Sequence, residues 1–275
     1  MKYNEKDALR AAQIVFKNGT KARRFNKGFS HDVYEVDTNS YPSKVVVKFS
    51  NENPEKFCLE KEIRVNSILQ KLGIPVSRII LHDNSKKIIP YEFIIMSKLE
   101  GEDLDKVLFK ISKKEQEEIL EKVGEILGKI HSVKFDKFGL LLPKGIDNVG
   151  DFSLKDVGNG VQTNPASFKL LSDGFSDLGK FASNKIVNSE FVSFLADYFV
   201  KNKSLAESEE SASLIHGDFY DQNIRVKKIN SKWFITGLLD FEYAAAYIKE
   251  FDFIKLARND FLKKGHLRDA ILRGY

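Results

Sequence analysis

The sequence predicts an α+β fold of two unequal parts, a small antiparallel sheet with one or two helices followed by a larger, mainly helical part. Short runs rich in Val, Tyr and Phe lie between residues 21 and 49 and are broken by turn residues. Helical periodicity dominates after residue 101. The chain has 275 residues, which is long for one compact core and short for two large domains. The boundary is expected near residues 97–101, so the two parts would span residues 1–97 and 98–275.

The N-terminal part is expected to begin with an amphipathic helix from residue 4 to about residue 18, which ends near Gly19. Residues 21–26, 31–38 and 44–49 follow as three short strands. Because short turns separate them, they are predicted to form an antiparallel meander.

A second helix is predicted between an N-cap at Asn53 and a stop at Gly73 and Pro75. Residues 76–83 and 91–99 then give two further strands. Together with the meander they would complete the small sheet.

The C-terminal part opens on a capping box, in which Ser112 and Glu115 begin a long helix. Residues 140–165 are rich in Gly, Asp and Asn and are expected to be a long loop, followed by two or three helices through about Val200. A hairpin turning at residues 229–232 precedes a closing helical region. The apolar stripe of the long helix is Ile119, Leu120, Val123, Ile126, Leu127 and Ile130.

Composition excludes several classes of protein. A net charge of +5 is a mild basic bias spread along the chain, which argues against a nucleic-acid-binding module. The N-terminus lacks the apolar segment of a signal peptide, and no apolar run is long enough to cross a bilayer. Cys58 is the single cysteine, so no intramolecular disulfide forms and a cytoplasmic location is expected. The sequence does not indicate an oligomeric state.

The stretch LIHGDFYDQNIRV, residues 214–226, concentrates polar side chains between two apolar strand ends. Asp218 and Asn223 lie five residues apart in a non-periodic loop, and the predicted hairpin would bring Asp240 back beside Asn223. Carboxylate and amide oxygens of this kind suit Mg²⁺, and one further Asp can receive the proton of an attacking hydroxyl. This arrangement is typical of phosphoryl transfer. Taken singly, Asp218 and Asn223 are also explained as turn-capping residues.

The two motifs resemble those of a known family. Residues 216–223 read H-G-D-x-x-x-x-N, and Asp240-Phe241-Glu242 follows, whereas protein kinases have H-R-D-x-x-x-x-N and then D-F-G. The chain resembles the aminoglycoside phosphotransferase and choline kinase-like family, which shares the bilobal protein-kinase fold, over nearly its whole length. The resemblance implies an N-terminal nucleotide-binding lobe, residues 1–97, and a C-terminal catalytic and acceptor-binding lobe, residues 98–275.

The same resemblance implies a role for each motif residue. Asp218 would be the catalytic base, and Asn223 and Asp240 would be the magnesium ligands. His216 would brace the catalytic loop rather than act as the base. Asp252 matches a family Asp that opens a helix, and we interpret it as structural.

Nucleotide binding requires a strand Lys paired with a helix Glu. Lys48 ends an apolar strand, as in the V-A-I-K strand of protein kinases. Glu60 and Glu62 are both available as partners in the next helix. Glu62 fits better, because it lies thirteen residues before Pro75, near the family spacing.

The resemblance also locates the remaining nucleotide contacts. Gly28 and Ser30 would belong to a glycine-poor loop over the phosphates. Met96, Ser97 and Leu99 match the family hinge, where backbone atoms would recognise adenine. The expected cofactors are therefore ATP and Mg²⁺.

The expected activity is transfer of the γ-phosphate of Mg-ATP to a hydroxyl of a small molecule. The acceptor stays open: related enzymes phosphorylate aminoglycosides, choline, homoserine, methylthioribose, fructosamines or macrolides. Two alternatives differ in class, a kinase-fold protein that binds nucleotide without transfer and a basic nucleic-acid-binding module. A serine/threonine protein kinase is a closer alternative, disfavoured because H-G-D replaces H-R-D and no A-P-E segment follows Asp240. Family members typically continue past residues 270–275 with further helices, so either a short form or a truncated chain is expected.

Overall fold

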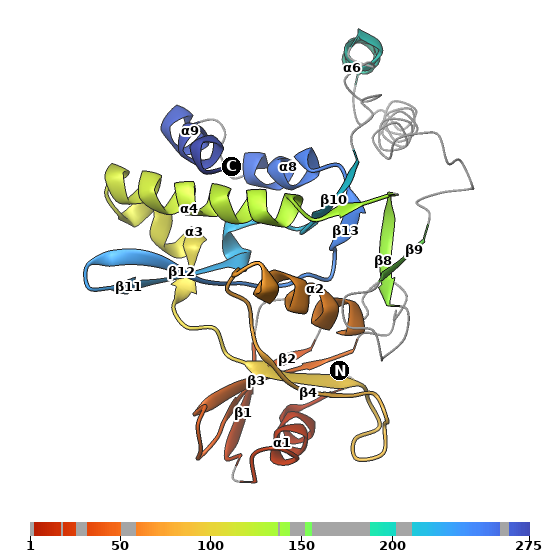
Figure 1. Ribbon diagram of the computed structural model, residues 1–275, viewed down its shortest axis with the longest axis vertical. Coiled ribbons are helices and arrows are strands. Elements are labelled where there is room, and N and C mark those ends of the chain that lie inside the picture. Colours follow the sequence, from red (N-terminus) through yellow and green to blue (C-terminus); the bar gives the residue numbers. More distant parts are fainter. Residues whose placement is uncertain are drawn as a thin grey trace.

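The computed structural model describes most of the chain, and all structural statements below concern that part (Figure 1). The described residues are 3–17, 19–25, 32–50, 59–136, 138–143, 152–155, 188–201, 211–258 and 264–275.

The N-terminal part is a five-stranded antiparallel sheet with a helix on each face (Figure 1). The strand order is β1-β2-β3-β5-β4, so strands adjacent in the sequence are mostly adjacent in the sheet. The elements are α1 (Glu5–Gln13), β1 (Lys21–Arg24), β2 (Val33–Asp37), β3 (Lys44–Phe49), α2 (Leu59–Lys71), β4 (Ile79–Asp83) and β5 (Phe93–Ser97).

The alternation of strand β3 decides which side chains meet each helix. Val45, Val47 and Phe49 are buried in one cluster with the apolar face of α1. Val46 packs in the other cluster with Leu59 of α2. Lys48, two residues after Val46, therefore also faces the α2 side, so alternation places a charged side chain next to this helix.

Helix α1 begins where the sequence predicts and ends earlier. Asn4 is the N-cap and forms a capping box with Asp7. The helix ends at Gln13 rather than near residue 18, and turns through Ile14 and Val15 lead to β1. The predicted N-cap of α2, Asn53, lies outside the described residues.

A three-stranded sheet belongs to the C-terminal part and begins just after the boundary between the two parts. Its order is β12-β11-β6, with β6 (Glu102–Asp103), β11 (Ile224–Ile229) and β12 (Lys232–Leu238). The β11–β12 hairpin turns through Asn230 and Ser231, both with positive φ, at the predicted place. Gly101 has φ +92°, and a Cβ there would lie 2.1 Å from the carbonyl oxygen of Val226, so only glycine lets the chain pass this close.

The C-terminal part is mainly helical, with a second sheet at one end. The helices are α3 (Leu104–Val107), the 3₁₀ helix η1 (Leu108–Lys110), α4 (Lys113–His131), α6 (Ser189–Lys201), the 3₁₀ helix η2 (Asp221–Asn223), α8 (Glu250–Arg258) and α9 (Gly265–Gly274). The second sheet has the order β7-β10-β13-β8-β9, from β7 (Lys134–Phe135), β8 (Gly139–Pro143), β9 (Phe152–Lys155), β10 (Ala212–Ile215) and β13 (Ala245–Tyr247).

Part of the predicted long loop at residues 140–165 is wrong, because β8 and β9 pair within it. Leu140 pairs with Lys155, and Leu142 pairs with Ser153. The run Leu140 to Leu142 lacks the alternation that marks a half-buried strand, and β8 also pairs with β13, about a hundred residues later. Among the described residues, no helix has both the length and the apolar character to cross a membrane.

The capping box of α4 gives a prediction for stability. Ser112→Ala removes the hydroxyl that accepts from the Glu115 amide at 3.3 Å and donates to the Glu115 carboxylate at 2.7 Å. Loss of such an N-cap typically costs about 1 kcal/mol of unfolding free energy. Hydrogen bonds from the Ser112 hydroxyl and amide, with one from Lys228, lower the pKa of Glu115 to about 2.

A lowered carboxyl pKa stabilises the fold above the ordinary glutamate pKa, and this contribution is lost as the pH falls towards the folded-state pKa. The difference in unfolding free energy between wild type and Ser112→Ala should therefore shrink between about pH 5 and about pH 2. Urea denaturation at several pH values measures it. A difference that stays constant with pH would contradict this account of the cap.

Candidate active site

The loop between β10 and β11 carries the predicted catalytic residues and is pressed against the segment that follows β12. Gly217 has φ +77°, and a Cβ there would lie 2.2 Å from the carbonyl oxygen of Tyr243. Only glycine fits both the conformation and the contact. The H-G-D motif thus owes its glycine to this close approach.

A fully buried carboxylate holds the start of this loop. Asp252 on α8 is 0% exposed, and its two oxygens accept the backbone N–H groups of His216 and Gly217, each at 2.8 Å. His131, at the end of α4, lies with Nε2 3.1 Å from Asp252, and its Nδ1 lies 2.9 Å from the Tyr275 hydroxyl. The Asp252 side chain therefore links α8 and the end of α4 to the loop, and His131 extends this link to Tyr275, the C-cap of α9.

His131 and Tyr275 were missed by sequence reasoning. His131 directly follows the apolar stripe of α4, and a polar residue at a buried helical position was the one available signal. Tyr275 had none, because its contact partner lies 144 residues away.

His216 braces the loop from within. Its Nδ1 accepts the backbone N–H of Asp218 at 3.3 Å, so the neutral ring carries its proton on Nε2 and donates it to the Leu239 carbonyl at 2.9 Å. The ring packs on Phe241 with centroids 4.7 Å apart. Both nitrogens are committed, so His216 is not placed to take a proton from a substrate.

Asp218, Asn223 and Asp240 come together at the strand ends. The Asn223 side-chain nitrogen donates to the Asp218 carbonyl at 2.9 Å and to its carboxylate at 3.3 Å, which leaves the amide oxygen as the atom that Asn223 can offer to a cation. Leu239 donates its N–H to the Asn223 carbonyl at 2.9 Å and so brings Asp240 to the same place. Asp240 adopts φ +65°, which non-glycine residues rarely do.

Lys48 reaches this group from the other part of the chain. Its ammonium lies 2.6 Å from the Glu62 carboxylate and 3.3 Å from that of Asp240. Lys48 and Glu62 are 5% and 4% exposed. Burial alone would lower the pKa of Lys48, but the carboxylates of Glu62 and Asp240 outweigh it and raise the pKa above its ordinary value. Glu60, the other candidate partner, instead pairs with Arg64 at 2.7 Å.

The predicted hinge side chains are engaged in packing. Met96 is buried with Leu59 and Ile94. The Ser97 hydroxyl accepts the backbone N–H of Arg78 at 2.8 Å. The Leu99 side chain packs against Gly237, where an added Cβ would lie 2.2 Å from it. Recognition of a base by the hinge backbone stays a prediction, and the predicted loop residues Gly28 and Ser30 lie outside the described residues.

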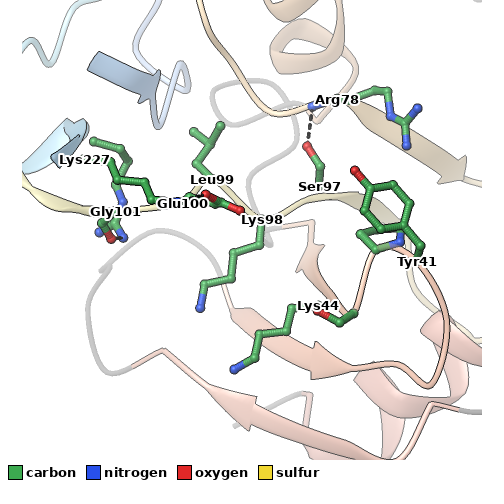
Figure 2. Close-up of a pocket in the computed structure, with 12 residues that line it drawn as sticks. Tyr41, Lys44, Arg78, Ser97, Lys98, Leu99, Glu100, Gly101 and Lys227 are labelled. Atoms are coloured by element: carbon green, nitrogen blue, oxygen red, sulfur yellow. Dashed lines mark hydrogen bonds and ion pairs between the residues drawn. The ribbon is translucent and has the colours of Figure 1, made fainter. Parts of the chain in front are cut away.

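A hollow of about 580 Å³ lies beside the hinge (Figure 2). Glu35 is buried, and its carboxylate binds two of the lining residues, Lys44 at 2.8 Å and Lys98. Burial would raise the pKa of Glu35, but the hydrogen bonds from Lys44 and Lys98 lower it. Carboxylate partners thus offset much of the positive charge in a lining whose basic residues are Lys44, Arg78, Lys98, Arg225 and Lys227.

Two lobes joined by a short linker, with a strand Lys facing a helix Glu and an Asp–Asn–Asp group below it, define a protein-kinase-like phosphotransferase. The profile described as "Phosphotransferase enzyme family" (APH) matches residues 21–275, and the chain belongs to that family. A comparison with curated protein sequences finds no match.

Solved structures share this fold at low sequence identity. The GDP and kanamycin complex of APH(2")-IIia has a TM-score of 0.65 at 15% identity, covering 98% of this chain and 82% of that chain. Spectinomycin phosphotransferase APH(9)-Ia, in complex with ADP and spectinomycin, has a TM-score of 0.61 at 14% identity, with 100% and 80% covered. Plasmodium vivax ethanolamine kinase has a TM-score of 0.56 at 14% identity, with 98% and 75% covered.

The buried ion pair gives a stability prediction. Lys48→Met leaves the Glu62 carboxylate buried without its main cation and should lower the unfolding free energy by about 3 kcal/mol. The double variant Lys48→Met/Glu62→Met removes both charges and should recover most of that loss. Urea denaturation measures all three proteins.

The control is Lys44→Met on the same strand. Lys44 is 41% exposed in its side chain, and Lys98 remains to pair with Glu35, so the loss of Lys44 should change stability much less than the loss of Lys48. Equal instability of the single and double variants at Lys48 and Glu62 would show that the pair does not control this stability.

Proposed function

We propose that the protein transfers the γ-phosphate of Mg-ATP to a hydroxyl group of a small molecule. The observation that carries the proposal is the Lys48 ammonium, which contacts Glu62 of one lobe and Asp240 of the other. Residues 1–97 would act as the nucleotide-binding lobe and residues 98–275 as the catalytic and acceptor-binding lobe. A cation fixed at this boundary is suited to hold the α and β phosphates of a nucleotide.

Asp218 is the catalytic base of the proposed reaction. The acceptor hydroxyl oxygen attacks the γ-phosphorus, its proton passes to the Asp218 carboxylate, and the bond to the β-phosphate oxygen breaks to release ADP. The Asn223 side chain fixes Asp218 through its carbonyl and carboxylate oxygens. His216 keeps the loop in place and takes no proton.

The donor set fits magnesium. The Asn223 amide oxygen and the Asp240 carboxylate are hard oxygen ligands, and Mg²⁺ commonly uses one or two carboxylates together with phosphate oxygens and water. The Asp240 side chain is 37% exposed, so it is accessible to a metal that enters with the nucleotide. A bound Mg²⁺ would neutralise charge that develops on the phosphates.

The identity of the nucleotide donor is left open by the comparisons and must be tested by experiment. One similar structure was solved with GDP and another with ADP. ATP is the proposed donor, with the base held by backbone atoms around Ser97 and Leu99. The predicted cytoplasmic location, inferred from the single Cys58, is compatible with either nucleotide.

The identity of the acceptor is left open in the same way. The similar structures include an enzyme with kanamycin, an enzyme with spectinomycin and an ethanolamine kinase. We propose an aminoglycoside-like polyhydroxylated amine as the first acceptor to test, with choline, homoserine, methylthioribose and fructosamine as alternatives. A nucleotide-binding protein without transfer activity is the competing function.

Two substitutions separate the proposed roles. Asp218→Asn should lower acceptor-stimulated ADP release by roughly 10²- to 10⁴-fold, because the base is lost, while Mg-ATP binding stays near wild type. Asp240→Ala should weaken Mg-ATP binding as well, because a metal ligand is lost. Coupled ADP release and calorimetric Mg-ATP binding measure the two effects over the acceptor panel.

Asp269→Asn is the matched control, since Asp269 is exposed on α9. It should leave both quantities unchanged. Equal small effects of Asp218→Asn and Asp240→Ala would mean that their roles are misassigned. Tight Mg-ATP binding with no release for any acceptor would favour the binding protein.

A further inference from the structure

The last residue of β12 and the segment after it, residues 238–242, are attached to the N-terminal lobe at several points. Leu238 donates its N–H to the Pro75 carbonyl at 2.9 Å and pairs with Val76 in a parallel bridge. The Asp240 carboxylate forms an ion pair with the Lys48 ammonium at 3.3 Å. The helix α2 and the turn after it therefore lie directly against the chain that carries the proposed metal ligand.

Lys61 on α2 makes a further attachment. It is 4% exposed, and its ammonium donates to the backbone carbonyl of Glu242. An ammonium buried this deeply is costly unless it is hydrogen-bonded, so its partner is a strong constraint on how α2 and this segment pack. Lys61 and Glu62 are consecutive on α2. Lys61 contacts the segment directly, whereas Glu62 binds Lys48, which in turn contacts Asp240.

Asp240 lies between two fixed points. Before it, Leu239 donates to the Asn223 carbonyl at 2.9 Å, and its own carbonyl accepts from His216 at 2.9 Å. Two residues after it, the Glu242 carbonyl accepts from Lys61. A residue at φ +65° persists where its surroundings hold it, and these contacts hold the backbone on both sides.

We propose that Lys61 is a positioning residue for magnesium binding. It fixes Asp240-Phe241-Glu242 against α2 and so keeps the Asp240 carboxylate where it can bind Mg²⁺ together with Asn223. This inference rests on the proposed function. The Lys61 ammonium is directed to a backbone carbonyl in a buried site, so the proposed role acts through Asp240 and requires no contact of Lys61 with nucleotide or acceptor.

Magnesium is sensitive to such a constraint because it requires near-ideal octahedral geometry. Groups that orient metal ligands typically change metal affinity by about 10- to 100-fold when they are replaced. Loss of Lys61 should therefore weaken the response of the site to Mg²⁺ more than it weakens binding of the nucleotide alone.

The experiment compares wild type, Lys61→Met and Lys61→Arg. Met keeps most of the side-chain volume without a donor, and Arg keeps a positive charge with donors. The control is Lys71→Met, which removes the same charge from an exposed position on α2. Calorimetry measures ADP binding with and without Mg²⁺, the half-saturating Mg²⁺ concentration is measured at fixed ADP, and urea denaturation measures the stability of each protein.

For Lys61→Met we expect a rise of about tenfold or more in half-saturating Mg²⁺, with metal-free ADP binding within about twofold of wild type. Lys61→Arg should lie between, and Lys71→Met should match wild type. Lys61→Met leaves the Glu242 carbonyl without the Lys61 donor, so some loss of stability is also expected, and urea denaturation measures it separately from the Mg²⁺ response.

Three outcomes would overturn the inference. If Lys61→Met and wild type share one Mg²⁺ dependence, Lys61 has no positioning role even though the proposed function stands. If ADP binding weakens equally with and without Mg²⁺ while the unfolding midpoint falls, the role of Lys61 is structural. If wild type itself binds no ADP under either condition, the proposed function fails and the inference fails with it.

Discussion

The Lys48 ammonium, held between Glu62 and Asp240, is the interaction on which the rest of the site depends. A lysine that is 5% exposed pays a large desolvation cost, and two carboxylates from different lobes offset it. The same geometry holds α2 and the segment after β12 next to strand β3, and it places one cation where the proposed function requires contact with phosphates. Removing either neighbouring carboxylate changes the charge balance at the boundary between the lobes. The buried pair is therefore a constraint on lobe arrangement as well as a part of the proposed chemistry.

A second constraint comes from Asp252 in the C-terminal part. The Asp252 carboxylate accepts two consecutive backbone N–H groups, which fixes the direction of the chain at His216 and Gly217. Gly217 then passes the Tyr243 carbonyl at a distance that no Cβ would allow. The proposed base follows on a backbone that α8 holds through Asp252, and His131 of α4 contacts Asp252 in turn. Rigid support of this kind suits phosphoryl transfer, because such enzymes act mainly by positioning charge.

Charged residues elsewhere on the protein contribute less to the structure of the site. Some cations around the hinge hollow are exposed and have exposed carboxylate partners, such as Lys227 with Glu100. Exposed pairs of that kind contribute little to stability and are screened by salt. Lys48 and Lys61 are buried, and each contacts the segment after β12. Burial, rather than the number of charges, separates the cations that organise the site from those that cover the surface.

The sequence by itself determined what is local. Caps, strand alternation and the β11–β12 hairpin depend on neighbouring residues, and the motif that places Asp218 five residues before Asn223 lies within one loop. The resemblance to the family, through its spacing to Pro75, also favoured Glu62 over Glu60 as the partner of Lys48, and the structure pairs Lys48 with Glu62. Only the tertiary structure decided the contacts of Lys61 with Glu242, 181 residues away, and of His131 with Asp252, 121 residues away, and the pairing of β8 with β13. The physical reason is that secondary structure depends on residues that are close in the sequence. The partner of a buried charge depends on how elements that are distant in the sequence pack together.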